Sequence, residues 1–315
     1  MKKILIAALL FGLLGWTAEA KTIKILYWNI QNGMWSDQGN NYDNFVAFVK
    51  ELDPDICVWA EAESRYRTDT ADKMAGCEEA YLPYNWDLLA ARYGHSYSVL
   101  AGKRDTFPQV VTSKFPLKTT KRINGNGEDI IVVHGAGIVD VSLPKGKTLH
   151  LVTLHTWPQK YAYLAEDQKA DAAAQGGDVF RAVEMKYICE ESILEQDPEG
   201  KGLWLMLGDF NALSRVDNAT YGRAEDDKAF LTHDYVRNNT PYIDLFEKWY
   251  DGRFEPSTLS GKRIDFMYMT PSLYKAVSEA LVLREGFAKN WRDPRKLHGF
   301  CHHSDHNPLY VEIKL

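Results

Sequence analysis

The chain has few cysteines, no excess of basic residues and no long apolar run beyond its first twenty residues. Four cysteines in 315 residues are too few for a disulfide-stapled scaffold. The 37 lysines and arginines are outnumbered by 43 aspartates and glutamates, which gives a formal net charge of −6. The protein therefore has no general positive field with which to hold nucleic acid. This disfavours a DNA-coating role but is compatible with an enzyme that acts on DNA.

The chain also lacks internal repeats, low-complexity tracts and any Pro/Gly/Ser-rich linker that would divide it. Its content of 45% hydrophobic and 25% charged residues is that of an ordinary folded protein with a sizeable core. Length alone would allow one large domain or two smaller ones. The missing linker favours a single domain over residues 21–315.

The first twenty residues have the order of a signal peptide. Lys2 and Lys3 precede an apolar run of 13 residues, 4–16, and Ala18-Glu19-Ala20 follows as an A-x-A cleavage site. The run is shorter than the roughly 20 residues of a membrane-spanning helix, so an uncleaved anchor is the weaker interpretation. We expect cleavage after Ala20, no transmembrane segment, and a periplasmic or secreted protein.

Hydrophobic periodicity predicts strands that alternate with a few helices. The predicted strands are 23–29, 54–61, 96–100, 109–112, 130–141, 148–155, 203–209, 263–268 and 309–315. The predicted helices are 41–52 and 177–195. Less regular stretches, which we expect to be loops, are 34–40, 64–95, 156–176, 212–241 and 285–301. Since the run 203–207 is apolar throughout, it should be buried on both faces, as in a layered α/β fold. We expect Cys57 and Cys189 to be small buried fillers.

Several predicted strands end abruptly in a residue that binds metals or protons. Apolar runs end at Asn29, Glu61, His155 and Asp209, and Asn211 follows Asp209 by two residues. If the backbone stays extended, Asp209 and Asn211 lie on one side of it. One such ending usually marks a turn, but so many in one chain indicate a shared site.

Two further motifs extend this set. Arg263 and Asp265 share a face of one predicted strand, and Ser304-Asp305-His306 precedes the last strand. Asn29, Glu61 and Asp305 offer the hard oxygen ligands that Mg²⁺ prefers. Together with the histidines, these residues suit metal-assisted hydrolysis of a phosphoester.

The motifs together resemble the endonuclease/exonuclease/phosphatase superfamily, which includes deoxyribonucleases, abasic-site endonucleases, neutral sphingomyelinases and inositol polyphosphate 5-phosphatases. The matching motifs, which span residues 28–306, are Trp28-Asn29, Glu61, Ser113-Lys114-Phe115-Pro116, Leu154-His155, Gly208-Asp209-Phe210-Asn211, Arg263-Ile264-Asp265-Phe266 and Ser304-Asp305-His306. The resemblance implies a four-layer αββα sandwich of two packed, mostly antiparallel or mixed sheets flanked by helices. It places the active site at one end of the sheets.

The resemblance also implies roles for individual residues. Glu61 would be the main Mg²⁺ ligand, with Asn29 and Asp305 beside it, and Mn²⁺ or Ca²⁺ are alternative ions. Asp265 would orient His306 as general base or phosphate ligand, and Asp209 would position or deprotonate the attacking water. Asn211 and His155 would contact the phosphate or assist the leaving group. Substrate contacts are assigned to Ser113, Arg263 and Ser304.

Three alternatives stay open at this stage. Glu63, two residues from Glu61, could share or replace its role. Cys301, His302 and His303 with His306 raise a transition-metal site, although their spacing fits no established zinc pattern. Deoxyribonucleases pair the first histidine with a glutamate on an earlier strand. The corresponding stretch 99–103 contains no glutamate, so the sequence identifies no partner for His155.

The leading hypothesis is an exported, Mg²⁺-dependent phosphoester hydrolase, acting on nucleic acid, a phospholipid head group or a small phosphorylated metabolite. The acidic charge argues mildly against a tight duplex binder, while exposed aromatic loops (Trp35, Tyr42, Trp86, Trp157, Trp291) would suit a lipid surface. The rival is a catalytically silent member of the same fold that binds a ligand or glycan. Every motif of the constellation is intact, which favours the enzyme. No obligate protein partner is evident.

Overall fold

The protein is described by a computed structural model that covers residues 21–34, 36–37, 41–63, 86–105, 107–284 and 303–315. The strands are β1 (Thr22–Asn29), β2 (Ile56–Ala60), β3 (Tyr97–Leu100), β4 (Val110–Ser113), β5 (Leu117–Gly125), β6 (Ile131–Ser142), β7 (Thr148–His155), β8 (Trp204–Asp209), β9 (Ile243–Asp244), β10 (Asp265–Met269), β11 (Val277–Val282) and β12 (Leu309–Lys314). The helices are α1 (Gln31–Met34), α2 (Asp43–Leu52), α3 (Trp86–Arg92), α4 (Gly176–Glu190), α5 (Ile193–Gln196), α6 (Asn218–Tyr221), α7 (Leu231–Asn239), α8 (Leu245–Trp249) and α9 (Pro271–Tyr274).

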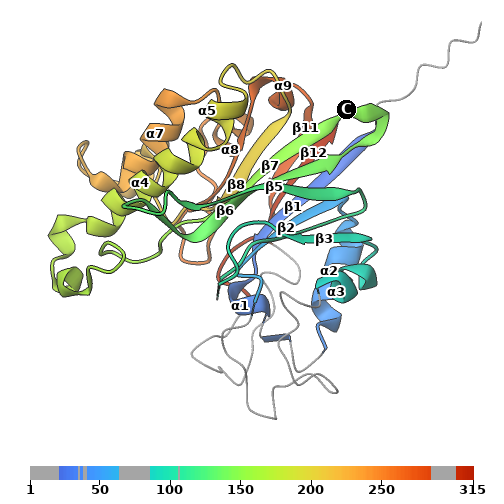
Figure 1. Ribbon diagram of the computed structural model, residues 1–315, viewed down its shortest axis with the longest axis horizontal. Helices are drawn as coiled ribbons and strands as arrows, with labels where there is room; N and C mark the ends of the chain where they lie inside the picture. The colour runs from blue at the N-terminus through green and yellow to red at the C-terminus, as the bar shows by residue number, and fades with distance from the viewer. Residues whose placement is uncertain (1–20, 35, 38–40, 64–85, 106, 285–302) are drawn as a thin grey trace, which may run out of the picture.

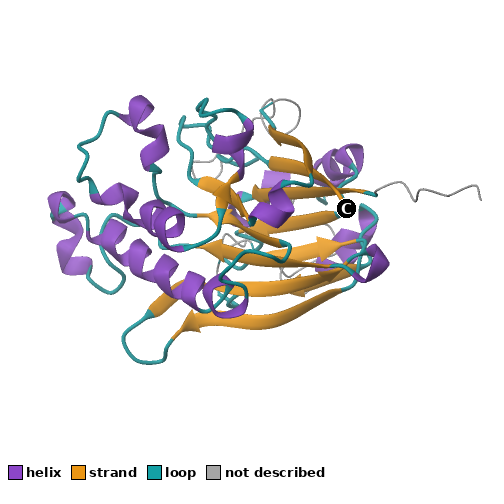
Figure 2. Cartoon of the chain, turned by 90° about the horizontal axis from the view of Figure 1, so that it is seen from above, coloured by secondary structure: helices purple, strands orange, loops and turns teal. Residues whose placement is uncertain are grey.

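Two six-stranded mixed sheets pack face to face, with helices on their outer faces (Figures 1 and 2). The first sheet has the order β11-β12-β1-β2-β4-β3 and the second β5-β6-β7-β8-β10-β9. Each sheet contains one parallel pair, β1 with β2 and β7 with β8, among antiparallel neighbours. This is the predicted four-layer αββα sandwich.

The core has three layers because the central strands are apolar on both faces. Between the sheets, Ile25 of β1 and Leu205 of β8 belong to one buried cluster. On the outer face of the first sheet, Trp28 packs with residues of α2 and α3. On the outer face of the second sheet, Met206 packs with residues of α4 and α7. The prediction that run 203–207 is buried on both faces is confirmed for the residues of β8.

Differences between the predicted and observed elements are confined to edge strands and short helices. All nine predicted strands form, but β5, β9 and β11 were missed. β5 is a largely exposed strand of polar sequence at a sheet edge, and β9 has only two residues. The expectation of loops over 64–95 and 212–241 is wrong where α3 and α7 form. These helices have seven and nine residues, and their short apolar patterns give little periodic signal.

The prediction that Cys57 and Cys189 are buried and unbridged is confirmed. Cys77 and Cys301 lie outside the described residues. Residues 1–20 also lie outside them, so the predicted signal peptide stays a prediction. In the described parts of the chain, every helix is too short or too polar to cross a bilayer.

Candidate active site

The carboxyl ends of the two parallel strand pairs bring the predicted residues together. The β1–β2 register pairs Asn29 with Ala60, so Glu61 follows directly beside Asn29. In the other sheet, the β7–β8 register pairs His155 with Asp209. A cavity of about 310 Å³ opens at this end of the sandwich. Its lining comprises Gln31, Asn32, Glu61, Phe107, His134, His155, Pro158, Asp209, Asn211, Ile264, Asp305 and His306.

The backbone around this cavity is strained. Four of the residues that line the cavity have a positive φ: Gln31 (45°), Asn32 (51°), Glu61 (52°) and Asn211 (45°). Residues other than glycine rarely adopt this left-handed backbone conformation. Such conformations persist only where the surroundings enforce them, and they concentrate at functional sites. The sequence argument assumed that the backbone stays extended after Asp209. The turn at Asn211 shows that it does not. Both side chains nevertheless line the cavity.

Glu61 lies on one side of the cavity, with both carboxylate oxygens in contact with the turn after β1. Its Oε1 accepts from Asn29 Nδ2 at 3.3 Å and its Oε2 from the Asn32 amide at 2.9 Å. Burial raises the pKa of Glu61, the neighbouring Asp305 raises it further, and the hydrogen bond from Asn32 lowers it. The side-chain oxygen of Asn32 is buried, and none of the described residues offers it a hydrogen bond.

Asp209 occupies the centre of the site, between two imidazoles. Its Oδ2 lies 3.8 Å from His155 Nε2 and 3.7 Å from His306 Nε2. The same oxygen accepts from Asn29 Nδ2 at 3.0 Å, and Oδ1 accepts from the Asn211 amide at 2.9 Å. Burial and the nearby Asp265 raise the pKa of Asp209 to about 7, although His306 and Asn211 act in the opposite direction.

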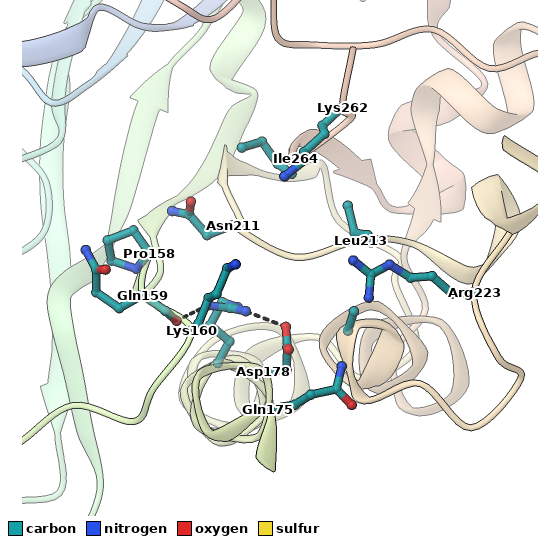
Figure 3. Close-up of a pocket in the computed structure, with 12 residues that line it drawn as sticks. Pro158, Gln159, Lys160, Gln175, Asp178, Asn211, Leu213, Arg223, Lys262 and Ile264 are labelled. Carbon is teal, nitrogen blue, oxygen red and sulfur yellow. Dashed lines mark hydrogen bonds and ion pairs between the residues drawn. The ribbon is translucent and has the colours of Figure 1, made fainter. Parts of the chain in front are cut away.

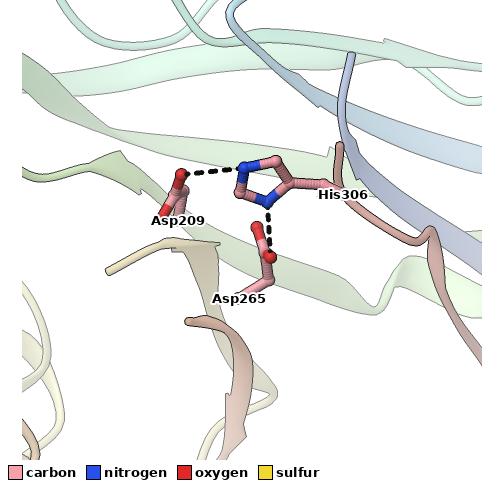
Figure 4. A group of neighbouring side chains, drawn as sticks. All are labelled: Asp209, Asp265 and His306. Atoms are coloured by element: carbon pink, nitrogen blue, oxygen red, sulfur yellow. Dashed lines mark hydrogen bonds and ion pairs between the residues drawn. The ribbon is translucent and has the colours of Figure 1, made fainter. Parts of the chain in front are cut away.

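His306 is anchored by Asp265 (Figure 4). Its Nδ1 donates to Asp265 Oδ2 at 2.7 Å, and the same carboxylate accepts from the Tyr27 hydroxyl at 2.8 Å and the Ser257 hydroxyl at 2.7 Å. Burial lowers the pKa of His306, but the carboxylates of Asp265, Asp209 and Asp305 outweigh it and raise the pKa well above its usual value.

His155 has a different environment. Burial lowers its pKa well below the usual value, electrostatic interactions with His134 and His306 lower it further, and a backbone hydrogen bond with Phe107 acts in the opposite direction. Within the described residues, its Nδ1 makes no hydrogen bond of normal geometry. Two neighbouring rings instead pack against it: His134, with ring centroids 4.7 Å apart and planes inclined by 27°, and Phe107, edge-on at 6.2 Å.

His134 and Asp105 are residues of the site that the sequence analysis missed. His134 lines the cavity and its Nδ1 donates to Asp105 Oδ2 at 2.7 Å. The missed signal is the antiparallel pairing of predicted strands 130–141 and 148–155. That pairing matches Ala136 with Leu154 and so brings the start of the first strand to the end of the second.

Three residues assigned to substrate contacts do not lie at the cavity, which corrects those predictions. Ser113 is fully buried near the start of β2, at the opposite end from Glu61, where its hydroxyl donates to the Asp55 carbonyl. Arg263 is buried in ion pairs with Asp217 and Asp244, each at 2.8 Å. Ser304 donates to the Asn29 carbonyl at 2.6 Å and so fixes the loop that carries His306.

The described residues bear on the open alternatives for metal ligands only in part, and the transition-metal site stays a prediction. Glu61 lines the cavity and Glu63 does not. Cys301 and His302 lie outside the described residues, and His303 Nδ1 lies 3.3 Å from the Ser36 hydroxyl. Asp209, Asp265 and His306 do offer ligand atoms within 4.8 Å of one another. Because Asp265 already accepts three hydrogen bonds, we assign this trio to hydrogen bonding rather than to a metal.

A second hollow of about 370 Å³ adjoins the cavity and shares Pro158, Asn211 and Ile264 with it. Four cationic residues line this basic annex, namely Lys160, Arg181, Arg223 and Lys262, against one carboxylate, that of Asp178. Figure 3 shows Lys160 and Lys262 directed into the space beside Asn211, with Arg223 on the other side of the hollow, next to Leu213. Arg181 pairs with Asp178, and Arg223 pairs with Asp227 at 2.8 Å. No ion pair of Lys160 or Lys262 occurs within the described residues.

Comparisons with known proteins agree with this architecture. Residues 26–306 match the model of the Endonuclease/Exonuclease/phosphatase family. An AP endonuclease from Archaeoglobus fulgidus is 14% identical with a TM-score of 0.57, covering 93% of this chain and all of that one. An endonuclease/exonuclease/phosphatase protein from Beutenbergia cavernae is 12% identical with a TM-score of 0.56, covering 93% and 72%.

The AP endonuclease LMAP from Leishmania major is 14% identical with a TM-score of 0.55, covering 93% of this chain and 88% of that one. At these identities the structural likeness shows a shared fold. A search of curated protein sequences gave no match.

Proposed function

Because the chain belongs to the endonuclease/exonuclease/phosphatase family, we propose that it is a Mg²⁺-dependent phosphodiester hydrolase. The observation that carries this proposal is the convergence of Glu61, His155, Asp209 and His306 on one cavity at the carboxyl ends of the strands. A phosphodiester anion repels an attacking water. A site that hydrolyses it therefore needs a cation, proton acceptors and imidazole donors at close range.

The residues on the Glu61 side fit a hard cation. Glu61 and Asp305 would hold it through carboxylate oxygens. Asn29 was predicted as a ligand, but its Oδ1 accepts from the Gln31 amide and its Nδ2 donates to Glu61, so it orients Glu61 instead. The side-chain oxygen of Asn32, unpaired within the described residues, is a further donor of the same kind. The ionised carboxylate of Glu61 is disfavoured by burial, and a bound cation would offset that penalty. When bound, Mg²⁺ would neutralise negative charge on the phosphate oxygens.

The opposite side of the cavity would handle protons. The oxygen of water forms a bond to phosphorus while the bond to the leaving oxygen breaks. Asp209 would take the proton that the water loses. The protonated ring of His306, 3.7 Å from Asp209 and held in place by Asp265, would donate a hydrogen bond to the phosphate. His155 would donate a hydrogen bond to the phosphate or the leaving oxygen, and Asn211 would hold the phosphate.

For the substrate, we propose a nucleic acid strand, with the scissile phosphate in the cavity and a neighbouring phosphate in the basic annex. The annex supplies local positive charge that the acidic chain lacks overall. Two aromatics that could have served a lipid surface, Tyr42 and Trp86, are instead buried in the core. Two of the structurally similar proteins are named AP endonucleases, which agrees with this substrate class.

We further propose that residues 1–20 direct export to the periplasm or the medium, on the strength of the charged, apolar and A-x-A segments. Sequencing the N-terminus of the secreted protein tests this. We expect it to begin at Lys21. An N-terminus at Met1 in a cytosolic fraction would contradict export.

Nicking of supercoiled plasmid in Mg²⁺ tests the activity, with EDTA as the metal-free control. We expect nicking that EDTA abolishes. Lys160→Ala/Lys262→Ala should weaken plasmid nicking about tenfold while leaving hydrolysis of bis(p-nitrophenyl) phosphate unchanged. The matched control is Lys145→Ala/Lys147→Ala, at an exposed turn before β7. A folded protein that binds Mg²⁺ but nicks no plasmid would contradict the nuclease assignment.

A further inference from the structure

The Asp105–His134 pair lies beside His155 and has no part in the mechanism above. Antiparallel pairing of β6 with β7 places His134 next to the end of β7. Gly135 adopts a φ of +69°, and a Cβ at this position would lie 2.5 Å from the Lys103 amide nitrogen. Only glycine therefore allows the segment that carries Asp105 to approach β6. The approach brings the Asp105 carboxylate to 2.7 Å from His134 Nδ1.

The ring of His134 is itself firmly held. His134 is 5% exposed, and Phe107 packs edge-on against its ring at 5.1 Å. The backbone carbonyl of His134 accepts from Gln109 Nε2 at 3.1 Å. By contrast, His155 has a backbone hydrogen bond with Phe107 as its hydrogen-bond contact, and within the described residues its Nδ1 has no partner of normal geometry. Ring packing therefore contributes to the orientation of the His155 ring, and the face that packs closest is that of His134, at 4.7 Å.

The surroundings of His155 also determine its charge. The titratable groups that face it are His134 from β6, Asp209 from β8 and His306 from the loop before β12. Burial disfavours the imidazolium form of His155, and His134 acts in the same direction as the next largest influence. A neutral His155 carries a single ring proton, which it can donate in one defined direction.

We propose that Asp105 and His134 are positioning residues: Asp105 fixes the ring of His134, and that ring holds His155 as a neutral imidazole facing Asp209. The kinetic part of this inference rests on the proposed function. The structural part, the orientation and charge of His155, stands without it.

The chain contains a matched control at the other end of the same two strands. His150 Nδ1 lies 2.7 Å from Asp140 Oδ1, and its ring stacks on Trp204 with centroids 4.4 Å apart. This pair has the same N–O distance as Asp105 and His134, but its side chains are 27% and 28% exposed and lie at the opposite end of β7 from His155. Substitutions at His150 and Asp140 therefore remove an equivalent histidine–carboxylate contact without changing the residues of the cavity.

The first test is an NMR titration of the imidazole resonances without metal, with His155 assigned by the loss of its signal in His155→Gln. In His134→Phe, which keeps a ring but removes the titratable imidazole, the pKa of His155 should rise. In His150→Phe it should stay at the wild-type value. If His134→Phe does not fold, His134→Gln should give the same upward shift. An unchanged pKa of His155 in the folded variant would overturn the proposal.

The second test separates the inference from the proposed function. In hydrolysis of bis(p-nitrophenyl) phosphate, Asp105→Asn should lower kcat about tenfold with little change in KM, whereas Asp140→Asn should match the wild type. Full kcat in Asp105→Asn would count against the positioning role. If the wild type hydrolyses no phosphodiester but the NMR shift is present, the proposed function fails and the positioning of His155 stands.

Discussion

Two histidines face the same carboxylate oxygen at nearly the same distance, but their pKa values are shifted in opposite directions. His306 and His155 lie 3.7 and 3.8 Å from Asp209 Oδ2, and both are buried. Three carboxylates raise the pKa of His306, whereas burial and two other imidazoles lower that of His155. Distance to Asp209 therefore does not decide their charge. The other groups around each ring decide it: carboxylates around His306, and burial with neighbouring imidazoles around His155.

This division separates two tasks within one cavity. The His306 side is held by hydrogen bonds to a carboxylate that three donors fix in place. The His155 side is held by ring packing and by the short segment around Asp105. A charged imidazole on one side and a neutral one on the other allow proton transfer in a defined direction across Asp209.

Removing the carboxylate shared by both histidines should have the largest effect. Asp209→Asn keeps the shape but cannot take a proton from water, so we expect kcat to fall about 10³-fold. Plasmid nicking and bis(p-nitrophenyl) phosphate hydrolysis both measure this. Asp226→Asn, at an exposed position, serves as the control. Retention of activity within tenfold in Asp209→Asn would show that the two histidines do not act through this carboxylate.

The anchor of His306 comes next. In Asp265→Asn an amide replaces the carboxylate that accepts three hydrogen bonds, so the ring of His306 loses its fixed orientation. We expect kcat to fall about 10²-fold. Tyr27→Phe removes one of the three donors and keeps the carboxylate, so it should lower kcat less. Equal losses in the two variants would mean that Tyr27, rather than the charge of Asp265, controls the site.

The neutral histidine should matter less than the charged side. His155→Gln still offers an N–H donor, but without the fixed direction of the imidazole, so we expect about a tenfold loss of kcat. Steady-state kinetics in Mg²⁺ measure it. If His155→Gln lost more activity than Asp265→Asn, the ranking of the two sides would be reversed.

Much of this arrangement could be predicted from the sequence, and the rest could not for physical reasons. Asn29, Glu61, His155 and Asp209 were identifiable because each ends an apolar strand, and such strands meet at one edge. His134 was not identified because it lies near the start of a strand. Its proximity to His155 depends on how β6 pairs with β7 and not on the hydrophobic pattern of the sequence. Arg263 was misassigned because its buried partners, Asp217 and Asp244, are distant in sequence, and only folding brings them together.

The smallest expected effect concerns the scaffold behind His155 and appears as pH-dependent stability. Glu184 of α4 is fully buried and accepts from the backbone amides of Val133 and Trp157, one beside His134 and the other two residues after His155. Burial raises its pKa to about 7, above the usual 4.5 of a glutamate. The folded state thus binds this proton more tightly than the unfolded state does.

The resulting stabilisation is fully present below about pH 4.5 and is lost as pH rises through 7, a contribution of about 3 kcal/mol. Glu184→Gln cannot ionise, so its Tm should fall less between pH 5 and pH 8 than that of the wild type. Thermal denaturation followed by circular dichroism measures the difference. Parallel pH dependence in both proteins would show that Glu184 is ionised throughout. In that case its two hydrogen bonds outweigh its burial, and the His155 side is held by charge after all, as the His306 side is.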